Sequence, residues 1–85
     1  MRIKPEFENR LRADPSARVA VIVTTDGPPG EFVSRAEVVG LEVHRQYRLR
    51  QMLALRGPAK AALALLDEPW VLSLEEDQPV TTMGS

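Results

Sequence analysis

Two apolar runs decide the fold: residues 18–25, RVAVIVTT, and residues 52–56, MLALR. Successive side chains of an extended chain point to opposite faces, so the three valines of the first run share one face, while Ala20 and Ile22 lie on the other. Both faces are apolar, and the second run has the same character. A strand that is apolar on both faces needs cover on both sides. The sequence therefore predicts two strands at the centre of a sheet.

Between these strands the chain predicts a loop, a helix and a second strand. Residues 26–30, DGPPG, have the composition of a loop. A helical spacing of apolar residues begins at Glu31 and ends at Gly40, a residue suited to the left-handed conformation that closes many helices. The side chains expected on the buried face of this helix are Phe32, Val33, Ala36 and Val39.

Residues 41–50, LEVHRQYRLR, alternate between apolar and polar side chains. This pattern predicts a half-exposed strand at the edge of the sheet. Arg45 is the one polar residue that falls on the apolar face. The apolar face is expected to hold Leu41, Val43, Tyr47 and Leu49, and the polar face Glu42, His44, Gln46, Arg48 and Arg50.

The remaining elements are two helices and a last strand. Ile3, Phe7 and Leu11 recur every four residues, which predicts a short amphipathic helix that ends at Asp14-Pro15 and folds back on the body. A third helix is expected to begin at Gly57-Pro58, because proline is favoured in a first turn. It ends at residues 67–69, before a strand at residues 70–74. Its expected buried side chains are Ala59, Ala62, Leu63 and Leu66.

The order of elements predicts an α+β, ferredoxin-like βαββαβ fold with a short N-terminal helix. Its four-stranded antiparallel sheet carries two helices on one face, with the two doubly apolar strands adjacent in the middle. The chain divides into an N-terminal helical extension (1–17), the ferredoxin-like domain (18–77) and an extended C-terminal tail (78–85).

The second face of the predicted sheet has no helix to cover it. An exposed apolar face of more than a few hundred Å² usually marks a partner site. Two alternatives stay open: small side chains such as Ala20 and Ala54 keep the apolar patch modest, or the N-terminal helix covers it.

Composition excludes several classes of function. The 85 residues carry a net charge of −1, so bulk attraction to nucleic acid or to an anionic membrane is not expected. The chain has no cysteine and a single histidine, His44, expected on a solvated face. Because no catalytic motif or metal-ligand spacing is present, we expect no enzyme, no cofactor and no metal. With no apolar leader at residues 1–10, a cytoplasmic location is expected unless the chain is part of a longer exported precursor.

The end of the chain changes character twice. A short apolar strand leads into three carboxylates, Glu75, Glu76 and Asp77, and then into an uncharged tail. This pattern, together with the order of elements, resembles the propeptide domain of subtilisin-type serine proteases and the free-standing inhibitors similar to it. The resemblance covers about residues 18–83. Residues 3–15 lie outside it, and Trp70 is bulkier than the family leads us to expect.

The resemblance implies a non-enzymatic inhibitor, and also a folding chaperone, of a subtilisin-like serine protease. In that family the open sheet face packs on two surface helices of the protease, and the carboxylates cap the N-termini of those helices. Here the capping residues would be Glu75 and Asp77. The family's tail lies in the substrate cleft as a product would. The corresponding residues are Val80, Thr81, Thr82 and Met83.

On this register Met83 enters the primary pocket and Val80 a second apolar pocket, while Gly84 and Ser85 lie beyond the scissile position. The free inhibitor is expected to be a monomer without nucleic-acid or membrane partners. Without the resemblance, the residues alone favour a solvated strand end for the carboxylates and a disordered terminus for the tail. Two other functions stay open. One is self-association through the open face, and the other is RNA binding, which usually needs aromatic residues on the central strands.

Overall fold

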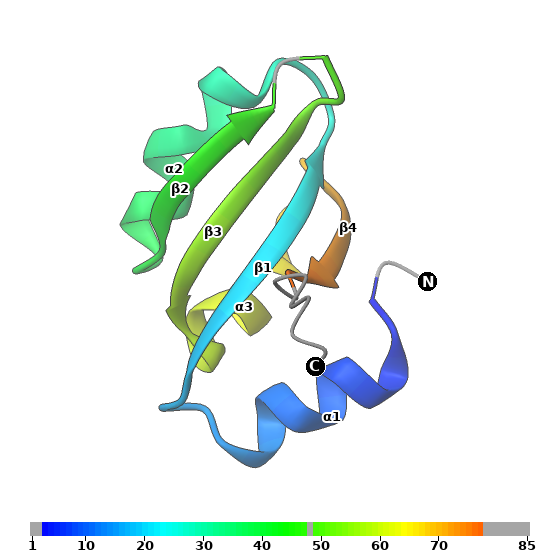
Figure 1. The fold of residues 1–85 in the computed structure, drawn as a ribbon, viewed down its shortest axis with the longest axis vertical. Helices are drawn as coiled ribbons and strands as arrows, with labels where there is room; N and C mark the ends of the chain where they lie inside the picture. Colours follow the sequence, from blue (N-terminus) through cyan, green and yellow to red (C-terminus); the bar gives the residue numbers. More distant parts are fainter. Residues whose placement is uncertain (1–2, 48, 78–85) are drawn as a thin grey trace, which may run out of the picture.

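The order of elements predicted from the sequence is confirmed. The structure, a computed structural model, describes residues 3–47 and 49–77. Its elements are drawn in Figure 1. In chain order they are α1 (Pro5–Ala13), β1 (Arg18–Thr25), the 3-10 helix η1 (Pro29–Phe32), α2 (Val33–Val38), β2 (Glu42–Tyr47), β3 (Met52–Pro58), α3 (Ala59–Leu65) and β4 (Val71–Glu76).

The sheet has four antiparallel strands in the order β2-β3-β1-β4. The two doubly apolar strands, β1 and β3, are adjacent in its middle, with Ile22 opposite Ala54 and Val23 opposite Leu53. This confirms the ferredoxin-like α+β fold. β2 and β4 are the edges, and β4 pairs with β1 so that Val23 lies opposite Leu74.

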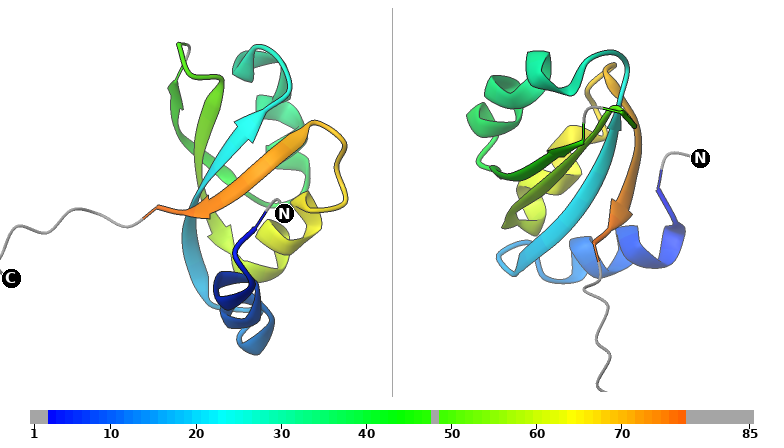
Figure 2. Two further views of the ribbon diagram at one scale, coloured as in Figure 1. Left: turned by 90° about the vertical axis from the view of Figure 1, so that its right-hand side faces the viewer. Right: turned by 45° about the horizontal axis from the view of Figure 1, so that its top comes forward.

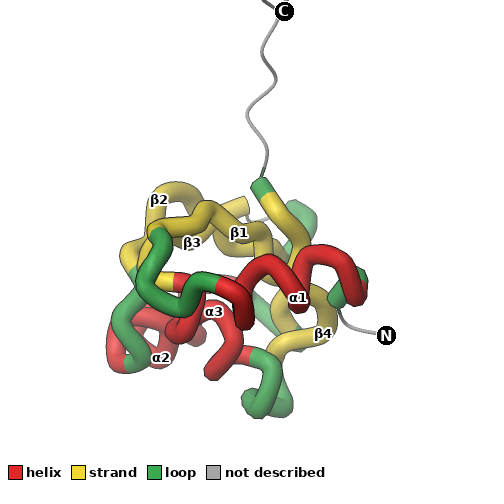
Figure 3. Tube along the Cα trace, turned by 90° about the horizontal axis from the view of Figure 1, so that it is seen from below, coloured by secondary structure: helices red, strands yellow, loops and turns green. Residues whose placement is uncertain are grey.

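All three α-helices lie on one side of the sheet (Figure 3). The core fills the space between them and the sheet. It takes Val21 and Val23 from β1, Leu53 and Leu55 from β3, and Leu74 from β4. Figure 2 shows the same layers from two further directions. The other side of the sheet carries no helix in the part of the chain that is described.

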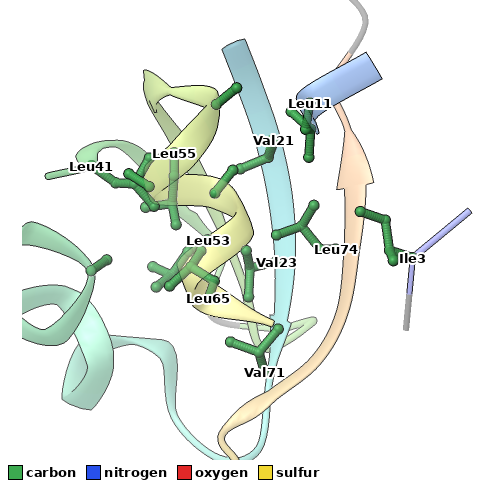
Figure 4. Close-up of a cluster of buried hydrophobic side chains, with 14 of the residues drawn as sticks. Ile3, Leu11, Val21, Val23, Leu41, Leu53, Leu55, Leu65, Val71 and Leu74 are labelled. Atoms are coloured by element: carbon green, nitrogen blue, oxygen red, sulfur yellow. The ribbon is translucent and has the colours of Figure 1, made fainter. Parts of the chain in front are cut away.

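Helix α1 is part of this core. Ile3, Phe7 and Leu11 are at most 8% exposed and belong to the same buried cluster as Val21 and Leu74. Figure 4 shows Leu11 and Ile3 beside Leu74. Because α1 lies on the helix side, it does not cover the open face. One of the two alternatives for that face is thereby ruled out.

Local signals explain where α1 begins and how its charges lie. Pro5 occupies the first turn, where its missing N–H is not needed. Acidic residues stand in the first turn and basic residues in the last, as the helix dipole favours. Glu8 and Arg12, one turn apart, form an ion pair of 2.6 Å on the exposed surface.

Two glycines allow the chain to turn after α2 and to pass close to β3. Gly40 has a φ of 103°, so it closes the end of α2 in a conformation that other residues rarely adopt. A Cβ on Gly57 would lie 2.8 Å from Leu41 Cδ2 and 2.9 Å from the Gly40 carbonyl oxygen. β3 and the chain before β2 can therefore approach this closely only because residue 57 is glycine.

The far end of β1 is fixed by hydrogen bonds and a ring stack. The Thr25 side chain is fully buried, and its hydroxyl lies 2.8 Å from the Gly27 carbonyl oxygen and 3.0 Å from that of Gln51. Next to it, Trp70 stacks on Phe32 with ring centroids 4.8 Å apart, and its indole N–H donates to Glu68 Oε1 at 3.0 Å. These contacts hold Trp70 in a buried position.

The predicted ends of β3 and β4 were wrong. Gly57 and Pro58 end β3, which runs directly into α3, and do not begin the helix. The last strand is Val71–Glu76 and not residues 70–74, so Glu75 and Glu76 belong to the strand. Both errors arise because backbone pairing with β1 extends each strand beyond its apolar residues.

The buried stripe of α3 also differs from the prediction. Its buried residues include Ala61 and Leu65, while Leu63 and Leu66 are only partly buried. Leu66 lies beyond the last residue of α3, and Ala61 faces Gly40, where a Cβ would lie 3.8 Å from Ala61 Cβ.

Candidate functional site

The helix-free face of the sheet, here called the open face, is built from alternate residues of all four strands. Its members lie opposite one another in the strand registers. One row across the strands reads Arg45, Ala54, Ile22 and Glu75 from β2 to β4. The next row reads Glu42, Arg56, Ala20 and Asp77, in which the Asp77 N–H donates to the Ala20 carbonyl oxygen at 2.9 Å.

The apolar content of the open face is modest. Ala20, Ile22, Met52 and Ala54 are not part of the core cluster, yet Ala54 is only 2% exposed. Among the described residues, three large hydrophobic side chains are strongly exposed: Val38 in α2, Leu49 in the β2–β3 turn and Leu72 in β4. Val38 and Leu49 lie outside the strands. Small side chains therefore keep the apolar patch at the centre of the open face small. This is one of the two alternatives that the sequence left open.

The two candidate capping carboxylates lie on β4, at one edge of the open face. Glu75 lies opposite Ile22, and Asp77 continues the same alternation beside Ala20. The strand geometry thus carries on through Asp77, and both side chains lie on the open side of β4. Glu75 is exposed and Asp77 is partly exposed. The sequence argument required this common orientation, and the structure provides it.

The third carboxylate, Glu76, points to the helix side and binds α1. Arg10 donates two hydrogen bonds to it, from Nη1 to Oε2 at 3.1 Å and from Nη2 to Oε1 at 2.5 Å. This hydrogen-bonded contact with Glu76 raises the pKa of Arg10 above its ordinary value. The end of β4 is therefore tied to the first helix of the chain. Sequence reasoning missed this pair, because its members are 66 residues apart.

A bulge in β2 changes which of its residues belong to the open face. The register with β3 shifts between Val43 and Arg45, so that Arg45 lies opposite Ala54 and Tyr47 opposite Met52. Val43 stays on the core side, opposite Leu55. The prediction that Tyr47 shares a face with Val43 is therefore wrong, and so is the placing of Arg45 on the apolar face. A bulge inserts one residue and reverses the alternation beyond it.

Leu49 also departs from its predicted place. It is fully exposed in the turn after β2 and does not extend the apolar face of that strand. His44 is exposed, as predicted, and its Nε2 lies 3.2 Å from Arg56 Nη2. Arginine can only donate, so His44 accepts through Nε2 in this contact.

The tail residues Val80, Thr81, Thr82 and Met83 lie outside the described residues, as do Gly84 and Ser85. Among residues 3–47 and 49–77, no group of three or more His, Asp or Glu side chains is placed to hold a metal ion. A hollow of about 260 Å³ lies between α1 and β4. Its charged lining mixes Lys4 and Arg10 with three carboxylates, Glu6, Glu75 and Glu76, so its charge favours no single class of ligand.

Comparison of the sequence with protein-family models finds no match, and comparison with curated proteins finds none. Within the described part of the chain, no helix is long and apolar enough to cross a membrane. The candidate site is therefore defined by the geometry of the open face and of the carboxylates at its end.

Proposed function

We propose that this chain is a non-enzymatic inhibitor of a subtilisin-like serine protease, and that the same binding mode lets it assist the folding of that protease. The observation that carries the proposal is the position of Glu75 and Asp77. Both lie on the open side of the edge strand β4, at the point where the chain continues into residues 78–85. A helix-free sheet face, two aligned carboxylates and a following tail are the three parts that this mode of inhibition needs.

The carboxylates supply the electrostatic part of the binding. The N-terminus of a helix exposes unpaired N–H groups and a partial positive charge, which an acidic side chain can satisfy. Side chains two residues apart on one face of a strand are separated by about 6.6 Å along the strand. Helices packed side by side are separated by about 8–10 Å. Glu75 and Asp77, with flexible side chains, can thus each reach the N-terminus of one of two adjacent helices.

The tail supplies the specificity. An extended segment can add as a strand to an open edge of the protease cleft, where alternate side chains fill pockets. We propose that Val80, Thr81, Thr82 and Met83 bind in this way, with Met83 in the primary pocket and Val80 in a second apolar pocket. Pro79 favours the extended backbone that this mode requires.

The carboxylates are tested by replacing both Glu75 and Asp77 with alanine. Inhibition of a broad-specificity subtilisin should weaken by roughly 1 to 3 kcal/mol, the sum of two helix-terminus interactions of ordinary size. The matched control replaces Glu31 and Glu37, two exposed carboxylates on the helix side, and changes the net charge equally. Thermal melts should be alike for all three proteins. A Glu75/Asp77 variant that inhibits as well as the parent would exclude capping.

The tail is tested by Met83→Asp and by deletion of residues 78–85. The point substitution should raise the inhibition constant at least about tenfold, because a carboxylate would be buried unpaired in an apolar pocket. The deletion should cost more and still leave weak binding through the open face. Equal constants for the parent and both variants would exclude the product-like mode. Failure of the parent to inhibit several such proteases would exclude the function itself.

A further inference from the structure

The open face carries two carboxylates on β4 and two arginines on β2 and β3, and one further carboxylate, Glu42 on β2, lies opposite Arg56. Glu75 and Asp77 lie on β4, while Arg45 and Arg56 lie on β2 and β3, in the same two rows. Neighbouring strands are about 4.8 Å apart, so the edge strands β2 and β4 are separated by roughly 14 Å. The acidic edge, Glu75 and Asp77 on β4, thus lies roughly 14 Å from Arg45 and roughly 10 Å from Arg56, and these two arginines are called here the basic edge.

Arg45 and Arg56 are available to a partner. Both are exposed, and within residues 3–47 and 49–77 neither has a carboxylate within ion-pair distance. The Arg45 guanidinium lies 5.8 Å from the centre of the Tyr47 ring, and Arg56 Nη2 lies 3.2 Å from His44 Nε2. Arg18, which also lies near this edge, is already 3.7 Å from Glu42.

The surface between the two edges suits an α-helix that crosses the strands. Its central residues, Ala20, Ile22 and Ala54, are small or partly buried, so a helix can approach the backbone closely. A helix whose N-terminus meets Glu75 or Asp77 advances about 1.5 Å per residue, and it reaches the basic edge after about nine or ten residues. At that distance the helix presents side chains from its third turn. Their charge must be negative to match Arg45 and Arg56.

We propose that Arg45 and Arg56 form a second charged contact of the open face, which selects proteases whose surface helices carry carboxylates about two to three turns after their N-termini. This inference rests on the proposed function, and names the partner surface that fits this chain. The acidic edge then fixes where each helix begins, and the basic edge fixes which helices are accepted. Binding to a protease whose helices are basic or apolar at this place would leave the arginines unpaired or repelled, which lowers the affinity for that protease.

The test measures inhibition constants for the parent and for Arg45→Gln/Arg56→Gln. Loss of two partly exposed ion pairs should raise the constant about tenfold at roughly 0.1 M salt and much less at roughly 1 M, where the Debye length is about 3 Å. The control, Arg35→Gln/Lys60→Gln, removes the same charge from the helix side and should change the constant less than about twofold. Arg45→Lys/Arg56→Lys keeps the charge and should retain most of the inhibition.

A second measurement identifies the partner residues. In a protease whose third-turn helix carboxylates are replaced by amides, the parent and Arg45→Gln/Arg56→Gln should inhibit equally, because the coupling is gone. If the parent inhibits and the double variant is equally strong against the unmodified protease, this inference is wrong and the proposed function stands. If the parent inhibits no subtilisin, both are wrong. A parent that sediments as a dimer, and becomes monomeric with Arg45→Gln/Arg56→Gln, would assign the face to a second copy of the chain.

Discussion

Replacing Leu11 with alanine should remove a large part of the stability of this domain, although Leu11 belongs to a helix outside the βαββαβ unit. Leu11 is 1% exposed and lies in the same cluster as Val21 and Leu74. The substitution deletes three carbon atoms, worth about 0.8 kcal/mol each on transfer to water, and leaves a cavity that the sheet cannot collapse to fill. The expected loss is therefore about 2.5 to 4 kcal/mol. A domain of this size is stable by roughly 4 to 13 kcal/mol.

The assay is urea unfolding followed by fluorescence. Trp70 is the only tryptophan, is 4% exposed and stacks on Phe32, so its emission reports the packed core. The transition midpoint should fall while the m-value stays constant, because the same surface is exposed on unfolding. The control is Asn9→Ala, on the exposed side of the same helix, which should change stability by less than about 0.5 kcal/mol.

A loss below about 0.5 kcal/mol for Leu11→Ala would refute the reasoning. It would mean that α1 is not part of the cooperative core and that residues 18–77 fold on their own. A shortened chain that begins at residue 16 tests independently whether α1 is part of the cooperative core. It should be largely unfolded if α1 completes the core, because removal of α1 exposes Leu74 and Val21 together.

Three further outcomes are expected. Gly57→Ala should destabilise the domain by about 1 to 3 kcal/mol, since the new Cβ would lie 2.9 Å from the Gly40 carbonyl oxygen; an unchanged melting temperature would contradict this. Thr25→Val should cost about 1 to 2 kcal/mol by removing a buried hydroxyl from its carbonyl partners, and the partly exposed Thr24→Val should cost less; equal losses in thermal melts would argue against it. Leu49→Ser should leave the midpoint of urea unfolding unchanged, because Leu49 is fully exposed; a measurable loss would show that the turn packs on the body.

Local pattern was sufficient for the type and order of the elements. The runs at residues 18–25 and 52–56 are apolar on both faces, which is a property of central strands in any sheet, and they are adjacent in the middle. The spacing of Ile3, Phe7 and Leu11 likewise marked a buried stripe, and all three are buried. The alternation of side chains at residues 75–77 predicts Glu75 and Asp77 on one side of the strand, and the pairing of β4 with β1 agrees.

Local pattern failed where the outcome depended on pairing between distant segments. Alternation in β2 put Tyr47 with Val43, but the bulge at His44 reverses the faces, because its place depends on how β2 aligns with β3. The one local signal of the bulge is the adjacent polar pair His44-Arg45 within an otherwise alternating strand. Arg10 and Glu76 are surface residues by every local criterion, and only packing of α1 against β4 brings them together.

The sequence by itself determined which segments are strands and helices, and the buried stripe of α1, because both follow from the period of apolar residues along a few neighbouring positions. The tertiary structure decided which face Arg45 and Tyr47 occupy, that α1 completes the core and leaves the open face uncovered, and that Glu76 is held by Arg10. These features depend on strand register and helix docking. Both are set by contacts between residues far apart in the chain, which no local period encodes.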